Sequence, residues 1–437
     1  MVIFQDSFMK GKETIDVLIV GAGAAGLAAW KELHSANLKA VLLEGRDRIG
    51  GRVWTDRSSD WPIELGAEFV HGKPPAIWLI LEQARLKVVE TSGLQMVAEK
   101  GGLQVCQKYW QIIQKIDEKI DLARDVPYSR FLAQTRASRF EKRMARNYVE
   151  GFNAARAELI STRAIAIADR AASEIEGPRQ FRIAAGYGSL TDWLAADLPG
   201  QALHLQTVVR EISWQKGRTV ITGDAPDGAQ TFSAARALIS APLGVLKAEP
   251  GSLGAIRFIP PLSQKAAALK HLEVGHAVKL MITFRERFWR DYPRLGFSIS
   301  FQEDVPVWWT QEPNPVNVLT GWAGGPAAEK LVNLSRQEVA NRAIGSLSRT
   351  FGKSEQSLRR NVLAMHYHNW SRDPFSRGAY SYPKVGGLEA AQILAEPVAS
   401  TLFFAGEATD SNGAYGTVHS ALQSGASAAR QIIDSFR

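Results

Sequence analysis

The chain has 437 residues, of which 45% are hydrophobic and 22% charged, and its formal net charge is +8. This length is more than one hydrophobic core usually serves, so the composition indicates a globular protein with two domains. The single cysteine, Cys106, excludes a disulfide framework within the chain and a cysteine metal cluster, and no apolar run approaches the roughly 18 residues of a membrane helix.

The chain opens without the basic segment and long apolar core of a secretory signal, so we expect a cytoplasmic protein with no membrane attachment and no bound metal. Residues 16–44 then predict a strand, a glycine turn, a helix and a second strand that ends in an acid. In the turn, Gly21 permits the tight bend, Gly23 leaves room for a pyrophosphate, and Gly26 lets the helix lie close to the sheet. With Ala25 in the same turn, these glycines present the helix N-terminus to the phosphates of a dinucleotide.

A second glycine turn follows directly from Glu44. The Glu44 carboxylate ends the second strand, where it can accept hydrogen bonds from a ribose diol. Arg46, Gly50, Gly51 and Arg52 come next. A nicotinamide site needs nothing after the acid, whereas a flavin dinucleotide has a longer diphosphate and ribityl chain that further backbone donors and an arginine can hold. We therefore favour a flavin dinucleotide.

With these two turns the sequence resembles the flavin-containing amine oxidases, which include monoamine oxidases, polyamine oxidases, L-amino acid oxidases and lysine-specific histone demethylases. The resemblance runs from about residue 14 to residue 433 and implies FAD as the cofactor. Because cofactor motifs occur near both ends of the chain, we expect a discontinuous, Rossmann-like α/β FAD-binding domain with an inserted α+β substrate domain of mixed sheet and helices. The expected FAD-binding segments are 12–90, 186–270 and 386–437, and the expected substrate segments are 91–185, which is helical, and 271–385.

The next motif, Gly66-Ala67-Glu68-Phe69, resembles the family loop that passes beside the flavin ring. His71 follows it and stands where animal polyamine oxidases carry a histidine, so we consider it a catalytic candidate. Glu68 is placed to help attract an ammonium group.

The middle of the chain carries fewer signals. Residues 124–146 are rich in arginine, which we interpret as a solvated helix face, because no nucleic-acid-binding motif accompanies it. Residues 203–214 alternate like one strand, and the resemblance implies that a backbone group of Val209 contacts adenine.

Lys279 is the one lysine in an apolar, strand-like stretch. From the sequence alone it could be an exposed residue on an edge strand. The resemblance implies another role, because the matching family lysine holds a water against N5 of the flavin. A cation there favours the charge that develops during reoxidation by dioxygen. Farther along, Trp308, Trp309 and Trp322 are candidates for walls of an apolar tunnel, or equally for large core aromatics.

Trp370 and Tyr380 bracket the next family motif, in which we expect Trp370 to contact the cofactor. Where the flavin is covalently attached, family members have a cysteine at the position of Ala379, so the alanine here implies noncovalent FAD. Tyr380 matches one wall of the aromatic cage that brackets the substrate amine. The second wall of monoamine oxidases aligns with Thr417, which is not aromatic, and this favours a polyamine oxidase or histone demethylase over a monoamine oxidase.

Near the C-terminus, an apolar strand leads to Gly406-Glu407, and a glycine-rich loop opens a helix near Thr417 and Val418. In the family, the acid matching Glu407 binds the ribityl chain. The helix points its N-terminus at the flavin pyrimidine ring, where its dipole would stabilise negative charge.

We therefore predict an FAD-dependent amine oxidase that converts a primary or secondary amine, polyamine-like or aromatic or aliphatic, to an imine while dioxygen is reduced to hydrogen peroxide. A +8 protein without an evident acidic cluster does not attract a polycation at long range, so an L-amino acid oxidase stays an alternative. That enzyme would need an arginine for the substrate carboxylate, for which Arg182, Arg290 and Arg377 are candidates. A flavin-binding interaction protein without turnover is a second alternative. The sequence predicts no nucleic-acid partner and leaves the oligomeric state open.

Overall fold

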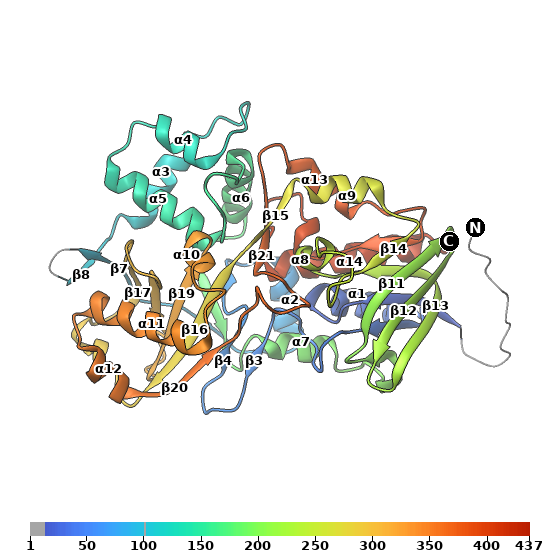
Figure 1. The fold of residues 1–437 in the computed structure, drawn as a ribbon, viewed down its shortest axis with the longest axis horizontal. Helices are drawn as coiled ribbons and strands as arrows, with labels where there is room; N and C mark the ends of the chain where they lie inside the picture. Colours follow the sequence, from blue (N-terminus) through green and yellow to red (C-terminus); the bar gives the residue numbers. More distant parts are fainter. Residues whose placement is uncertain (1–13, 100–101) are drawn as a thin grey trace.

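The computed structural model describes residues 14–99 and 102–437 of the protein. The expected absence of a secretory signal, and the start of the first domain segment at residue 12, lie outside the described residues. Two large sheets lie at opposite ends of the molecule, and a group of helices stands beside the second (Figure 1). The prediction of a Rossmann-like α/β unit combined with an α+β unit is confirmed. None of the described helices is both long and apolar enough to cross a membrane.

The first sheet has eight strands and a parallel centre. In spatial order they are β10 (Leu203–His204), β2 (Ala40–Leu43), β1 (Ile15–Val20), β13 (Gly228–Ile239), β12 (Arg218–Ala225), β11 (Val208–Gln215) and β14 (Arg257–Ile259), with β22 (Leu402–Phe404) also paired to β13. β1 pairs in parallel with β2 and β13. Val17, Leu18 and Ile19 in β1 are fully buried, as expected for a parallel strand covered on both faces.

Helices α1 (Ala24–Ser35) and α14 (Val418–Asp434) share the hydrophobic core on one face of this sheet. Small residues allow the two helices to approach closely, since a Cβ atom at Gly425 would lie 2.1 Å from the backbone oxygen of Ala25. The first and last helices of the chain are thereby packed against each other.

The single strand expected over residues 203–214 is wrong, because β10 and β11 are separated by a turn. Gln206 has a φ of +51° there. The backbone N–H groups of Gln206 and Thr207 donate to the carbonyls of Arg46 and Glu44, at 2.7 and 2.8 Å. These partners lie far away in the sequence, so local alternation of residue types does not reveal the break.

The second sheet contains seven strands. In spatial order they are β20 (Val362–Tyr367), β16 (Ala277–Phe284), β19 (Val318–Gly324), β18 (Val307–Thr310), β17 (Leu295–Ile299), β7 (Leu94–Glu99) and β8 (Gly102–Val105). Helix α11 (Arg336–Phe351) packs its buried side on the core that this sheet forms. β16 is an interior strand, since it pairs with both β19 and β20.

The segment 91–185 is helical only in its middle. Its first part is the hairpin β7–β8 of the second sheet, and its helices are α3 (Tyr109–Asp117), α4 (Tyr128–Gln134), α5 (Arg139–Phe152) and α6 (Thr162–Glu174). In the arginine-rich part, Arg146 pairs with Glu150 at 2.9 Å, and Arg143 lies over the ring of Phe301 at 4.7 Å. These contacts fit a helix face that interacts with the protein itself.

The remaining elements are shorter. They are the strands β3 (Thr55–Asp56), β4 (Ile63–Glu64), β5 (Val70–His71), β6 (Val88–Glu90), β9 (Gln180–Ile183), β15 (Leu272–Gly275) and β21 (Tyr380–Pro383), and the helices α2 (Pro75–Gln83), α7 (Gly188–Leu194), α8 (Leu243–Leu246), α9 (Ser263–Leu269), α10 (Pro326–Glu329), α12 (Glu355–Asn361) and α13 (Leu388–Ala395). The division of the chain into five domain segments stays a proposal.

Candidate active site

One cavity of about 430 Å³ is lined by residues of both large sheets and of the helical group. The residues that the sequence singled out and that line it are Gly21, Gly23, Ala25, Glu44, Arg46, Gly50, Gly51, Arg52, Gly66, Ala67, Glu68, Phe69, His71, Val209, Lys279, Trp370, Tyr380, Gly406, Glu407, Thr417 and Val418. Gly26 does not line the cavity, because it faces the turn, and a Cβ atom there would lie 2.0 Å from the backbone oxygen of Gly21. The fold therefore brings motifs from both ends of the chain to one place.

The first glycine turn leaves backbone donors open toward the cavity. Helix α1 begins after Gly23 without a side-chain cap, so its first N–H groups are free of a protein side chain. A Cβ atom at Gly23 would meet nothing closer than the Cα of Gly51, at 3.9 Å. The Glu44 carboxylate accepts the N–H groups of Ala22 and Arg46 at 2.9 and 3.0 Å, which fixes it beside the turn. This arrangement fits a pyrophosphate and a ribose.

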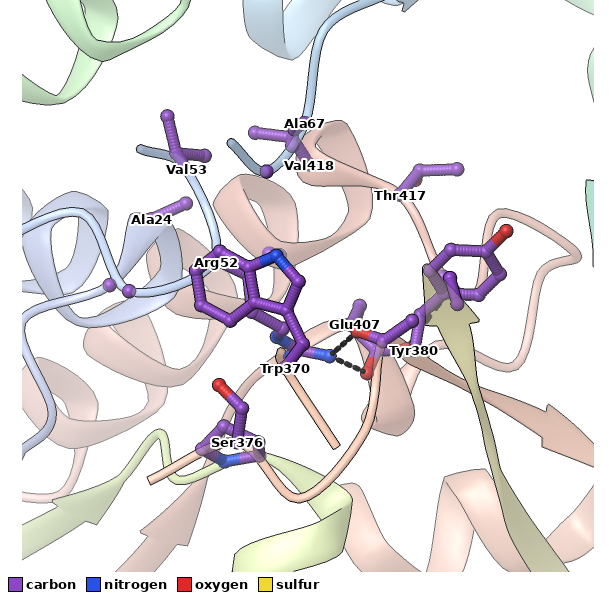
Figure 2. A pocket seen from close by; sticks show the side chains of 18 of the residues that line it. Ala24, Arg52, Val53, Ala67, Trp370, Ser376, Tyr380, Glu407, Thr417 and Val418 are labelled. Atoms are coloured by element: carbon purple, nitrogen blue, oxygen red, sulfur yellow. Dashed lines mark hydrogen bonds and ion pairs between the residues drawn. The ribbon is translucent and has the colours of Figure 1, made fainter. Parts of the chain in front are cut away.

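Two arginines join distant parts of the chain at the cavity wall. Arg46 forms an ion pair with Asp373 at 2.8 Å. Arg52 donates to the backbone oxygen of Ala379 at 2.7 Å and to the Glu407 carboxylate at 2.9 Å. Figure 2 shows Arg52 and Glu407 in contact beside Trp370 and Tyr380. The glycine turn near the N-terminus is thus tied to the acid near the C-terminus, as one elongated cofactor would require.

Lys279 lies at the junction of the two sheets and is not an edge residue. Its strand, β16, is internal, and its side chain is 4% exposed. The ammonium group contacts the Glu68 carboxylate at 2.7 Å and donates to the backbone oxygen of Gly66 at 3.0 Å. Both partners belong to the loop that the sequence indicated beside the flavin.

Glu68 is buried and paired with protein cations, and its expected role in attracting an ammonium group stays a prediction. Its carboxylate pairs with Arg182 at 2.9 Å as well as with Lys279, and it accepts the indole N–H of Trp309 at 2.9 Å. Burial alone would raise the pKa of Glu68, but the charges of Lys279 and Arg182 lower it to about 2. The carboxylate is therefore ionised and already satisfied by protein cations.

The part of the cavity away from the glycine turns has a continuous aromatic wall. Ring contacts of 5.1 to 6.0 Å link Trp110, Tyr148, Phe152, His71, Phe69 and Trp309 in that order. Tyr380 joins this wall by a hydrogen bond from its hydroxyl to the backbone oxygen of Phe152. Burial, with a smaller contribution from His419, lowers the pKa of His71 to about 4, so the imidazole is neutral near neutral pH.

Sequence reasoning did not identify most of this wall. Tyr148 and Phe152 are four residues apart on α5, a spacing that places them on one helix face and could have indicated the pair. Tyr415, in the glycine-rich loop before α14, also lines the cavity and was not predicted. Of the three tryptophans considered for a tunnel, Trp309 and Trp322 line the cavity, whereas Trp308 is a fully buried core residue.

None of the three arginines considered for a substrate carboxylate is both unpaired and in the described cavity lining. Arg182 pairs with Glu68 and also donates to the backbone oxygens of Thr310 and Glu312 at 3.1 and 3.2 Å. Arg290 and Arg377 are not among the described residues that line the cavity. The described cavity lining thus contains no unpaired arginine that could bind an α-carboxylate.

Comparison with known proteins agrees with this geometry. The family model described as flavin containing amine oxidoreductase matches residues 24–107 and 118–433. Polyamine oxidase 2 from Arabidopsis thaliana is 30% identical, over 94% of this chain and 87% of that protein. Lysine-specific histone demethylase 2 from Homo sapiens is 28% identical over 90% of this chain and 50% of that protein.

Solved structures with the same fold include two amine oxidases. A putrescine oxidase with bound putrescine matches with a TM-score of 0.82 and 22% identity, covering 97% of this chain and 99% of that chain. Cyclohexylamine oxidase from Brevibacterium oxydans IH-35A matches with a TM-score of 0.80 and 19% identity, covering 97% and 100%. At these identities the likeness concerns the fold.

Proposed function

Because the chain belongs to the family of flavin-containing amine oxidoreductases, we propose that it oxidises a carbon–nitrogen bond of a primary or secondary amine to an imine, with dioxygen as the acceptor. Bound FAD supplies the two-electron chemistry, so that amine and dioxygen yield imine and hydrogen peroxide. The observation that carries the proposal is the position of Lys279, between the dinucleotide turns and the aromatic wall. The single cysteine, Cys106, is free and forms no disulfide in the described chain, so the cytoplasm stays the proposed compartment.

The aromatic wall prepares the amine for oxidation by removing water. Amines are mostly protonated near neutral pH, and only the neutral form has the lone pair needed to release a hydride equivalent from its α-carbon. A desolvated cavity disfavours the ammonium form and lowers the pKa of the amine. Tyr380 presents an aromatic face there, and neutral His71 adds no charge that would oppose an incoming amine. No side-chain base is required.

The ion cluster of Arg182, Glu68 and Lys279 contains two cations and one anion. Arg182 has a partner in Glu68, so the cluster as a whole keeps a net positive charge next to the loop Gly66–Phe69. A positive charge fixed in a buried site stabilises negative charge that develops beside it without reorganisation of solvent. Lys279 is therefore the proposed catalytic group for dioxygen reduction, and Glu68 and Arg182 are the proposed positioning residues.

Two other functions compete with this proposal. An L-amino acid oxidase is disfavoured because the described cavity offers no free arginine. A flavin-binding protein without turnover would bind FAD but remain oxidised when amines are added without oxygen. An anaerobic screen of amines for bleaching of the flavin, followed by a peroxide assay in air, tests the proposed function. Failure of every amine to bleach the flavin would overturn it.

We expect the flavin to be released when the protein is denatured by acid or heat. Ala379 lines the cavity where related proteins carry a cysteine, and alanine has no nucleophile that could form a thioether. The measurement is flavin absorbance in the supernatant after the protein has precipitated. Flavin that stays with the pellet after washing in denaturant would contradict noncovalent binding.

The rise of kcat/KM with pH should report the amine and not His71. The pKa of His71 is lowered from 6.5 to about 4, so the imidazole takes up a proton only below that pH. We expect His71→Gln to keep the same ascending limb as the wild type. Amines of different basicity should move this limb in both proteins. A limb that disappears or shifts only in His71→Gln would show that His71 itself titrates during turnover.

A further inference from the structure

Each charged side chain discussed in the cavity lining forms an ion pair with another protein group. Arg46, Arg52 and Glu407 are paired at the dinucleotide end. Lys279 and Arg182 share the Glu68 carboxylate as their ion-pair partner. No unpaired carboxylate or cation is left in the described lining for the remote end of a substrate.

Four neutral amides also line the cavity. They belong to Gln95, Asn147, Asn153 and Gln180. Amides can form hydrogen bonds, but they do not supply the opposite charge that a buried ammonium or carboxylate needs. The wall is therefore suited to an uncharged substrate body.

Two members of the aromatic wall are exposed. They are Trp110 and Phe152, with exposed fractions of 42% and 44%. Large exposed apolar residues beside a cavity favour apolar ligands over polycations. The net charge of +8 also repels polycations at long range.

Resting on the proposed function, we infer that the substrate is a monoamine with an uncharged aromatic or alicyclic body, and that the cavity discriminates against diamines, polyamines and α-amino acids. This differs from the polyamine preference that Thr417 suggested. Thr417 leaves one wall of the family cage without an aromatic residue, but Tyr415 and the aromatic wall supply aromatic surface from elsewhere in the chain. The inferred substrate also differs from the polyamines named for the polyamine oxidases to which this chain is similar.

Two nearby carboxylates do not line the cavity. Asp117 is 5% exposed and accepts the Tyr128 hydroxyl at 2.6 Å, and burial raises its pKa to about 7. Asp169 lies on α6, outside the lining. Burial raises the pKa of the wall residue Tyr148, and the charge of Asp169 raises it further. Asp169 is thus the strongest candidate for a hidden ammonium partner, and the experiment has to include it.

The test compares substrates that differ by one charge. Butylamine and putrescine differ by a second ammonium group, and 2-phenylethylamine and L-phenylalanine differ by a carboxylate. The holoenzyme is mixed anaerobically with each compound, and flavin reduction is followed by stopped flow. We expect the monoamine of each pair to be favoured by about 100-fold or more in reduction efficiency, as for a buried charge without a partner.

Variants that change one charge sharpen the comparison. Asn153→Asp places a carboxylate in the cavity lining and should raise the ratio of putrescine to butylamine about tenfold. Asn341→Asp, on the exposed surface of α11, is the matched control and should change nothing. Asp169→Asn should also leave the wild-type ratio unchanged.

The outcomes separate the inference from the proposed function. Equal efficiency within either substrate pair would overturn the inference while leaving amine oxidation intact. A selective loss of putrescine activity in Asp169→Asn would do the same, because it would reveal a carboxylate that serves a second ammonium. If no compound reduces the flavin, the proposed function itself fails.

Discussion

Lys279→Met should slow reoxidation of the reduced flavin by dioxygen about 100- to 1000-fold, the loss typical for removal of one preorganised charge from a water-excluded site. The fold should tolerate the change, because Glu68 keeps its ion pair with Arg182 and its hydrogen bond from Trp309. Flavin content should be unchanged, since Lys279 contacts Glu68 and Gly66 and makes no contact with Glu44 or Arg52.

The measurement separates the two half-reactions. The variant is reduced anaerobically with an active monoamine and then mixed with oxygenated buffer in a stopped-flow instrument. We expect the reductive step to change far less than reoxidation. Lys247→Met is a matched control, because Lys247 also contacts one glutamate, Glu273, at 3.2 Å and one backbone oxygen, of Leu272, at 2.7 Å, but lies outside the cavity lining. Reoxidation at the wild-type rate in Lys279→Met would show that Lys279 has only a structural role.

Gly23→Val should yield a folded protein that has lost most of its flavin. The backbone at Gly23 is extended, with φ at −80°, and a Cβ atom would lie 3.9 Å from its nearest neighbour, Gly51. The apoprotein therefore has room for a side chain at this position. The added side chain would instead occupy the space in front of the N-terminus of α1, where the pyrophosphate has to approach the backbone.

Glu44→Ala provides an independent measure of the same site. Losing a charge-assisted hydrogen bond of about 1.5–3 kcal/mol corresponds to roughly 10- to 150-fold weaker flavin binding. Flavin per protein is measured by absorbance after purification, and folding by circular dichroism. The matched control for Gly23→Val is Gly200→Val, because Gly200 is exposed and no heavy atom lies within 4 Å of its added Cβ. Full flavin occupancy in both Gly23→Val and Glu44→Ala would overturn the assignment of the dinucleotide site.

Gly26→Val should behave differently from Gly23→Val, although both glycines belong to one motif. A Cβ atom at Gly26 would collide with the backbone of Gly21, so the substitution is expected to damage the packing of α1 on the sheet. Loss of flavin in Gly26→Val therefore says little about the cofactor. The contrast shows why the two positions must not be used interchangeably as probes.

The sequence by itself determined the local structure at the proposed dinucleotide end of the site. The spacing of Gly21, Gly23 and Glu44 fixes a turn, a helix start and a strand end within one short unit, and such local geometry follows from backbone sterics and hydrogen bonding. Helix α14 was likewise predicted from the loop that precedes it, and Thr417 caps it by accepting the N–H of Ser420 at 3.2 Å. These features depend on neighbours in the chain.

Only the tertiary structure decided the partners of Lys279 and the nature of the substrate end. Glu68 and Arg182 are 114 residues apart. Lys279 on β16 reaches the carboxylate of Glu68 and the carbonyl of Gly66, both in the loop between β4 and β5. No spacing rule connects such residues, because their proximity results from the packing of whole elements. The same holds for the wall that begins at Trp110 and ends at Trp309. The sequence could therefore indicate the proposed dinucleotide turns, whereas the ion pairs beside them follow from long-range packing alone.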